Sequence, residues 1–161
     1  MKQIEKYLAD IAIRVNWIAA GAIIVMMSLT SADVILRFFR HPIPGTYEIV
    51  GLMGAVAASF SLAYTTVMKG HIAVEFLVRK LPRHVQYGID IITGFAGFLL
   101  FAILAWQSAL YAMNLKTNSE VSLTLQMPIY PFIFGIAIGC GLLSLVLAAN
   151  SITALKRITT P

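Results

Sequence analysis

The sequence predicts an all-α integral membrane protein with four transmembrane helices. Of its 161 residues, 59% are hydrophobic and 12% are charged, and the mean hydropathy is +0.84, whereas about a quarter of the residues in a soluble domain are charged. The charges are also clustered, so that four long windows contain none. Each window is long enough to cross about 30 Å of hydrocarbon at about 1.5 Å per residue. We therefore expect a single membrane domain over residues 1–161.

The uncharged windows also predict where each span lies. The four spans are expected at approximately 15–36, 48–68, 90–114 and 128–154. The first could instead be a secretory signal, but it is longer than the usual apolar core of a signal and lacks a convincing cleavage motif. The last window opens with VSLTLQMP, which is polar enough for a loop or a strand-like approach. Because proline is tolerated in a first turn, the fourth helix is expected to begin near Pro128.

A basic, amphipathic segment, KGHIAVEFLVRKLPRH, separates the second and third spans over 69–84. Its apolar residues follow the i, i+3, i+4, i+7 spacing of one helix face; they are Val74, Leu77, Val78 and Leu81. Glu75 lies four residues before Arg79 and can pair with it, and Pro82 ends the pattern. The segment spans only about half the hydrocarbon thickness. It predicts a short helix over 72–82 that lies against anionic lipid in the interface, with a solvated loop as the alternative.

The distribution of Lys and Arg predicts the orientation in the membrane. With four spans, the two termini and the second connection share one face, which holds nine of the twelve Lys and Arg residues. The other face holds Arg37, Arg40 and Lys116. The positive-inside rule then places both termini in the cytoplasm. The net charge of +5 is thereby explained by topology, and no nucleic-acid partner is expected.

The spans contain few groups that could carry chemistry. Ionisable groups at the membrane midplane usually mark ion or substrate pathways, but the deep positions here offer hydroxyls and no carboxylate. The three histidines, His41, His71 and His84, all lie in connections, which argues against a shared haem or metal site. Cys140 lies alone in the fourth span and is expected to be a buried apolar residue. We therefore expect no enzyme activity, no cofactor and no metal.

Four charged residues crowd the outer rim, where the first two spans meet; they are Asp33, Arg37, Arg40 and Glu48. Asp33 and Arg37 lie one turn apart on a helix, and the short turn that follows can bring Glu48 close, so we expect Arg37 to be held between the two carboxylates. Arg40 would then point outward and could dock another protein. The alternative is that these charges only anchor the helix ends.

The fourth span contains a close-packing signal. Gly135 and Gly139 form a GxxxG pair, and Ala55 with Ser59 forms a similar small-residue pair in the second span. Small residues let helix backbones approach closely, and this close packing favours association in lipid, where no hydrophobic driving force acts between helices. The two glycines are therefore candidate positions for helix–helix contact.

Three segments occur in a fixed order from about Ala32 to Leu147; they are DVILRFFRHPIPGTYEIVG, KGHIAVEFLVRKLP and LTLQMPIYPFIFGIAIGCGLL. Together they resemble the small four-helix permease subunit of tripartite ATP-independent periplasmic (TRAP) transporters. The most specific parts are the Asp33/Arg37 turn followed by Pro-Gly-x-x-Glu, and the Gly-His-Ile-x-Val-Glu motif that contains His71 and Glu75. Tyr130 stands where that family often has tryptophan, and the first thirty residues match only as a hydrophobic helix.

The resemblance implies a function and a set of partners. Such subunits pair with a large multi-span permease subunit that carries the substrate and sodium sites, and a periplasmic substrate-binding protein delivers an organic anion such as a dicarboxylate, keto acid or sialic acid. The small subunit would scaffold the large one in a bacterial or archaeal inner membrane and is a candidate to help receive the binding protein. The alternatives are an autonomous four-helix transporter, which would need a carboxylate inside a span, and the membrane anchor of a respiratory complex.

Overall fold

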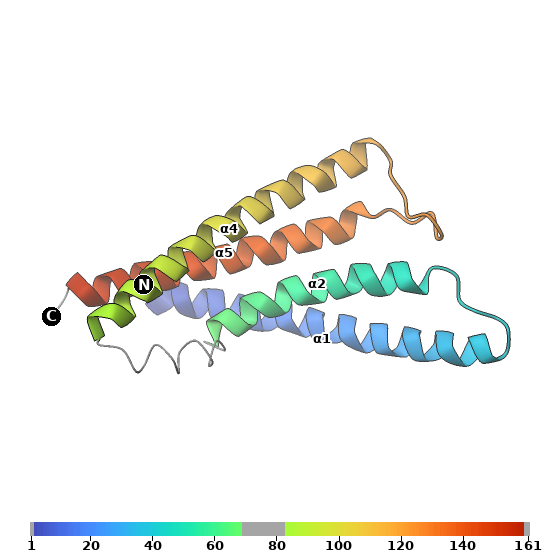
Figure 1. Cartoon of the computed structure of the whole chain (residues 1–161), viewed down its shortest axis with the longest axis horizontal. Helices are drawn as coiled ribbons and strands as arrows, with labels where there is room; N and C mark the ends of the chain where they lie inside the picture. The colour runs from blue at the N-terminus through green and yellow to red at the C-terminus, as the bar shows by residue number, and fades with distance from the viewer. Residues whose placement is uncertain (1, 69–82, 160–161) are drawn as a thin grey trace.

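The computed structural model describes residues 2–68 and 83–159 (Figure 1). Over these residues the chain forms four long helices, which are α1 (Lys2–Phe38), α2 (Thr46–Val67), α4 (Arg83–Thr117) and α5 (Tyr130–Thr159). Each contains a segment that is long and apolar enough to cross a membrane, which confirms the predicted fold class. The interfacial helix predicted over 72–82 lies outside the described residues.

The helices extend beyond the predicted spans. α4 has 35 residues, which is about 50 Å of helix and exceeds the hydrocarbon thickness of about 30 Å. The predicted bounds were taken from the uncharged windows. Such a window indicates the part of a helix that lies in hydrocarbon, whereas the helix itself continues to its last hydrogen-bonded turn. α5 begins at Tyr130, slightly after the predicted start at Pro128, and Pro131 lies in its first turn as expected.

The helices form two hairpins that pack side by side. α1 and α2 are joined by residues 39–45, and α4 and α5 by residues 118–129. α2 packs against α5, so that the order across the bundle is α1, α2, α5, α4 (Figure 1). The beginning of α1 and the end of α5 lie at one end of the bundle, and both connections lie at the other (Figure 1). We call this second end the loop end.

Small side chains fill the contact between the helices. Ala19 and Ala22 of α1 pack with Ala57 and Phe60 of α2 in one buried cluster. α5 approaches α2 closely at Gly139, where an added Cβ would stand 2.6 Å from Ser59 Oγ and 2.8 Å from Phe60 Cδ1. Close van der Waals contact of this kind holds helices together in lipid.

Candidate functional site

Residues 36–41 end the first helix and begin the turn at the loop end. Arg40 adopts a left-handed conformation with φ 61°. The backbone N–H of His41 donates to the carbonyl of Leu36 at 2.9 Å, and that of Arg40 donates to Arg37 at 3.0 Å. These two bonds form a Schellman cap, which satisfies the last carbonyls of a helix and reverses the chain. The Arg40 side chain remains exposed, as the sequence predicted.

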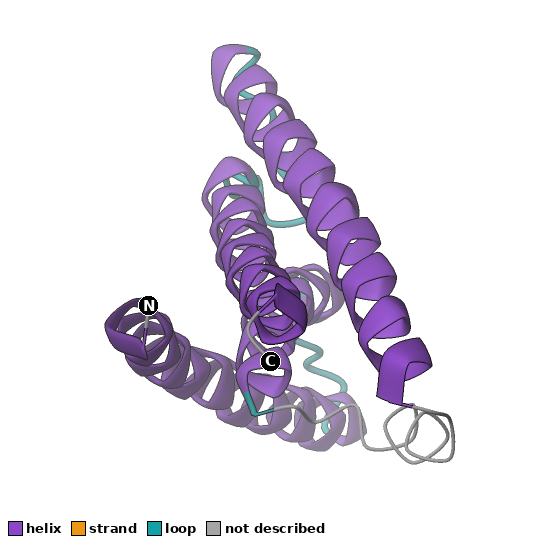
Figure 2. Ribbon diagram, turned by 90° about the vertical axis from the view of Figure 1, so that its left-hand side faces the viewer, coloured by secondary structure: helices purple, strands orange, loops and turns teal. Residues whose placement is uncertain are grey.

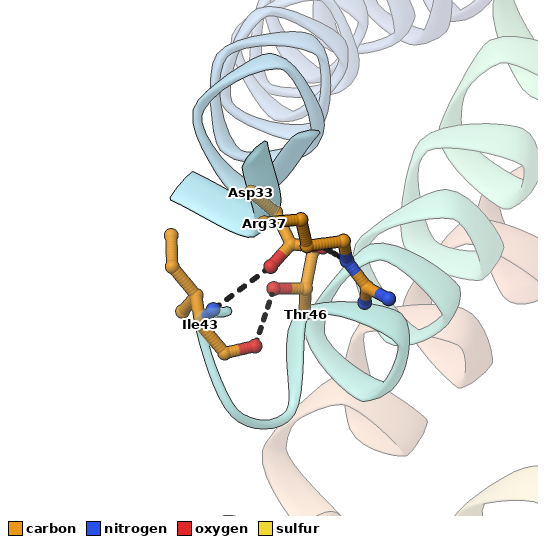
Figure 3. A network of polar contacts seen from close by, with 4 residues as sticks. All are labelled: Asp33, Arg37, Ile43 and Thr46. Atoms are coloured by element: carbon orange, nitrogen blue, oxygen red, sulfur yellow. Dashed lines mark hydrogen bonds and ion pairs between the residues drawn. The ribbon is translucent and has the colours of Figure 1, made fainter. Parts of the chain in front are cut away.

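Asp33 connects the end of α1 to the start of α2 (Figure 3). The residue is buried, with 4% of its surface exposed. Its Oδ2 accepts a hydrogen bond from Arg37 Nε at 2.7 Å, and its Oδ1 accepts one from the backbone N–H of Ile43 at 2.8 Å. The Thr46 hydroxyl donates to the Ile43 carbonyl at 3.0 Å. Since a buried carboxylate is tolerated only with partners, this network determines the path of the turn.

Arg37 pairs with Asp33 as predicted, but not with Glu48. Its guanidinium carbon lies 5.3 Å from the centroid of the Tyr47 ring, a distance that allows a cation–π contact. Among the described residues, Arg37 forms its ion pair with Asp33. The expectation that Glu48 would form the second half of this cluster was therefore wrong, because the Glu48 carboxylate is occupied by hydrogen bonds to another part of the chain.

Glu48 joins the first hairpin to the second. Its Oε1 accepts a hydrogen bond from the backbone N–H of Thr124 at 2.9 Å, and its Oε2 accepts one from Leu125 at 3.3 Å. Glu48 lies in the first turn of α2, whereas the two donors belong to the connection between α4 and α5. Hydrogen bonds to an ionised acceptor are about twice as strong as those between neutral groups. We call this pair of bonds the Glu48 tie.

The connection that receives the Glu48 tie has its own internal structure. Val121 and Pro128 form an isolated antiparallel bridge, which agrees with the predicted loop or strand-like approach. The N–H of Ser122 donates to the carbonyl of Met127 at 2.9 Å, and the N–H of Gln126 donates back to Ser122 at 3.2 Å. The backbone donors at 124 and 125 are thus presented by a closed turn.

Gly45 forms a second contact between the hairpins. It has φ +76° and caps the start of α2. The Leu125 side chain occupies the space where a Cβ of residue 45 would stand. Both the backbone conformation and the space therefore favour glycine here. The Glu48 tie and the contact of Gly45 with Leu125 together connect the two hairpins at the loop end.

The other candidate residues lie elsewhere. Gly135 and Gly139 both lie at the contact of α5 with α2, where a Cβ at Gly135 would stand 3.3 Å from Val56. His71 and Glu75 fall outside the described residues. The sequence reasoning missed Thr124 and Leu125, because backbone donors have no signature in a sequence.

The charged groups at the loop end make hydrogen bonds and ion pairs that join helices, so the site suits a structural or docking role. Within 2–68 and 83–159, no group of three or more His, Cys, Asp or Glu residues could hold a metal ion.

Comparison with protein-family models matches residues 26–157 to the DctQ component of tripartite ATP-independent periplasmic transporters. The chain belongs to this family. The match contains both connections of the loop end and begins close to the point at which the sequence resemblance begins. No curated protein matches the chain.

Membership in the DctQ family confirms the resemblance found in the sequence. A DctQ component is the small component of a TRAP transporter, so the chain is a transporter component and a multi-pass membrane protein. The first 25 residues precede the matched range, although they belong to α1 from Lys2 onward. The motif around His71 and Glu75 lies within the match.

Proposed function

We propose that this DctQ component is the small subunit of a sodium-driven importer of an organic anion, from the dicarboxylate, keto acid or sialic acid class. In this proposal the chain is a scaffold for the large permease subunit and carries neither the substrate site nor the sodium site. The absence of a carboxylate at the deep positions of the four spans supports this division of labour, because ion coupling in a membrane normally uses buried ionisable groups.

The observation that carries the scaffold role is the Glu48 tie. A scaffold must hold its helices at fixed positions while its partner moves. Here two bonds from one carboxylate and the contact of Gly45 with Leu125 connect the hairpins at the loop end. The close approach at Gly139 connects them again within the membrane. Two separated contacts oppose rotation of one hairpin against the other.

The proposed location is the inner membrane of a bacterium or archaeon, with both termini in the cytoplasm. The nine-to-three distribution of Lys and Arg supports this orientation through the positive-inside rule. The loop end then faces the periplasm, where the binding protein delivers its substrate. The exposed Arg40 is the residue that we propose for contact with that protein.

Transport by reconstituted components tests the proposal. We expect liposomes that contain only this chain to accumulate no organic acid. Uptake should require the large permease subunit, the periplasmic binding protein and an inward sodium gradient. Liposomes that lack this chain but contain the other components are the matched control. Sodium-driven uptake by this chain alone would overturn the scaffold proposal in favour of an autonomous transporter. A Soret absorbance band in the purified chain, which indicates bound haem, would instead favour the membrane anchor of a respiratory complex.

A further inference from the structure

Most hydroxyls in the spans are satisfied within their own helix. Ser28 donates to the carbonyl of Ile24 at 2.9 Å, Thr30 to Met26 at 2.8 Å, and Ser61 to Ala57 at 2.7 Å. This back-bonding lets Ser and Thr face lipid without an unpaired donor. These hydroxyls therefore require no partner outside the chain.

Gln107 differs from these hydroxyls. It is exposed and lies within the part of α4 that can cross a membrane, about 15 Å before the end of the helix at Thr117. Its side chain makes no hydrogen bond with any residue that the structure describes. A glutamine amide has two N–H donors and one carbonyl acceptor, and hydrocarbon can satisfy none of them. An amide at this depth indicates contact with another protein.

Gln107 shares one exposed face of α4 with other residues. Six exposed residues follow one another at alternating intervals of four and three along α4; they are Ala96, Leu100, Ile103, Gln107, Leu110 and Asn114. This is the a/d spacing of a heptad repeat. Gln107 and Asn114 are seven residues apart and occupy equivalent positions in it. We call these six residues the Gln107 face.

The Gln107 face points away from the rest of the chain. α4 packs on α5 through its other side, where Ala112 and Leu115 are buried and where a Cβ at Gly97 would stand 3.1 Å from Leu147. Among the described helices, only α5 packs extensively along α4, and both views place α4 at the edge of the bundle (Figures 1 and 2). Most of the described α4 residues are therefore not buried within the chain.

We infer that the Gln107 face docks on a transmembrane helix of the large permease subunit, and that this helix carries a hydrogen-bonding side chain opposite Gln107. The inference rests on the proposed function and adds to it the surface that meets the partner. Lipid offers the apolar residues of the face a suitable environment but leaves the Gln107 amide unpaired. A polar residue at a repeated a position sets the register of two packed helices, which is the property that a scaffold contact needs.

The test measures association with the large subunit in detergent. Gln107→Leu keeps the side-chain size and suits lipid better, so a face in lipid would tolerate the change. We expect about a three- to thirtyfold weaker association, the range for one interhelical hydrogen bond in a membrane. The matched control is Met113→Leu, an exposed position of α4 outside the Gln107 face. It should leave association unchanged.

Photo-crosslinking identifies the occupant directly in the intact complex. A photoreactive residue at position 103 or 110 should crosslink to the large subunit, and one at the exposed position 24 of α1 serves for comparison. Crosslinks from 103 and 110 only to lipid, or only to a second copy of this chain, would overturn the inference. If the wild-type chain does not co-purify with the large subunit at all, the proposed function itself fails. If wild type and Gln107→Leu co-purify equally, only the docking face is wrong.

Discussion

The carboxylate of Glu48 accepts a hydrogen bond from the backbone N–H of Thr124, although 76 positions separate the two residues in the sequence. The bond joins the first turn of α2 to the connection between α4 and α5. These elements belong to different hairpins, so the bond closes the bundle at the loop end. A single carboxylate therefore contributes to the relative position of all four helices.

The first prediction concerns this carboxylate. Glu48→Gln preserves the shape of the side chain but replaces one acceptor oxygen by an NH₂ group, which faces a backbone N–H that also donates. We expect the amides of residues 122–126 to exchange with solvent several-fold faster, measured by hydrogen–deuterium exchange in detergent. Glu120→Gln, an exposed change in the same connection, is the control. Equal protection in both variants would show that the turn holds its shape without the Glu48 tie.

The second prediction concerns Gly45. Gly45→Ala places a Cβ at a residue with φ +76°, which costs about 1–2 kcal/mol for an L-residue in a left-handed conformation, and the Cβ also overlaps Leu125. We expect a lower thermal unfolding midpoint in detergent. Adding Leu125→Ala should recover only part of the loss, because the backbone cost remains.

Gly51→Ala is the control for this substitution, since a Cβ at Gly51 meets no atom within 4 Å. Alanine is a better helix former than glycine by about 1 kcal/mol, so this variant should unfold at the same temperature as the wild type or higher. If Gly45→Ala behaves like Gly51→Ala, the hairpins do not depend on the contact with Leu125.

The fold and the Asp33–Arg37 pair at the loop end were predictable from the sequence for physical reasons. Uncharged windows of hydrocarbon length follow directly from the requirement of the bilayer, and they located all four helices. The pairing of Asp33 with Arg37 was also visible, because residues four apart lie on one helix face. Both signals are local, and each is encoded by side chains that are close in the sequence.

The partners of Glu48 were not predictable in this way. Thr124 and Leu125 donate through their backbone, and any residue other than proline could do the same. The sequence near Gly45 indicates a turn, but the neighbour that fills the space beside it depends on how the two hairpins pack. Arg37 was the nearer and more conspicuous partner for Glu48, and it is already neutralised by Asp33.

The third prediction concerns Arg37. Arg37→Ala leaves the buried Asp33 carboxylate with the N–H of Ile43 and the nearby Thr46 hydroxyl but without its cation, and an uncompensated buried charge is destabilising. We expect less of the variant to co-purify with the large subunit. The double variant with Asp33→Asn should recover part of the loss, because asparagine can still accept the hydrogen bond from Ile43 without a charge. Normal co-purification of Arg37→Ala would mean that the pair only anchors the end of α1.

The last prediction separates assembly from docking. Arg40 is exposed, and its backbone forms the cap of α1, so Arg40→Glu changes the charge of the surface without removing a hydrogen bond that the structure shows. We expect the variant to co-purify normally with the large subunit but to transport more slowly. The deficit should be larger at low salt, because salt screens charges on an exposed rim and such charges mainly affect the association rate.

Lys116→Glu, an exposed charge reversal in the last turn of α4, tests whether any change of charge at the loop end has this effect. Equal uptake by Arg40→Glu and wild type at both ionic strengths would exclude Arg40 from binding-protein docking. A salt-dependent loss of uptake in Arg40→Glu that Lys116→Glu does not share would place the docking contact beside the turn between α1 and α2.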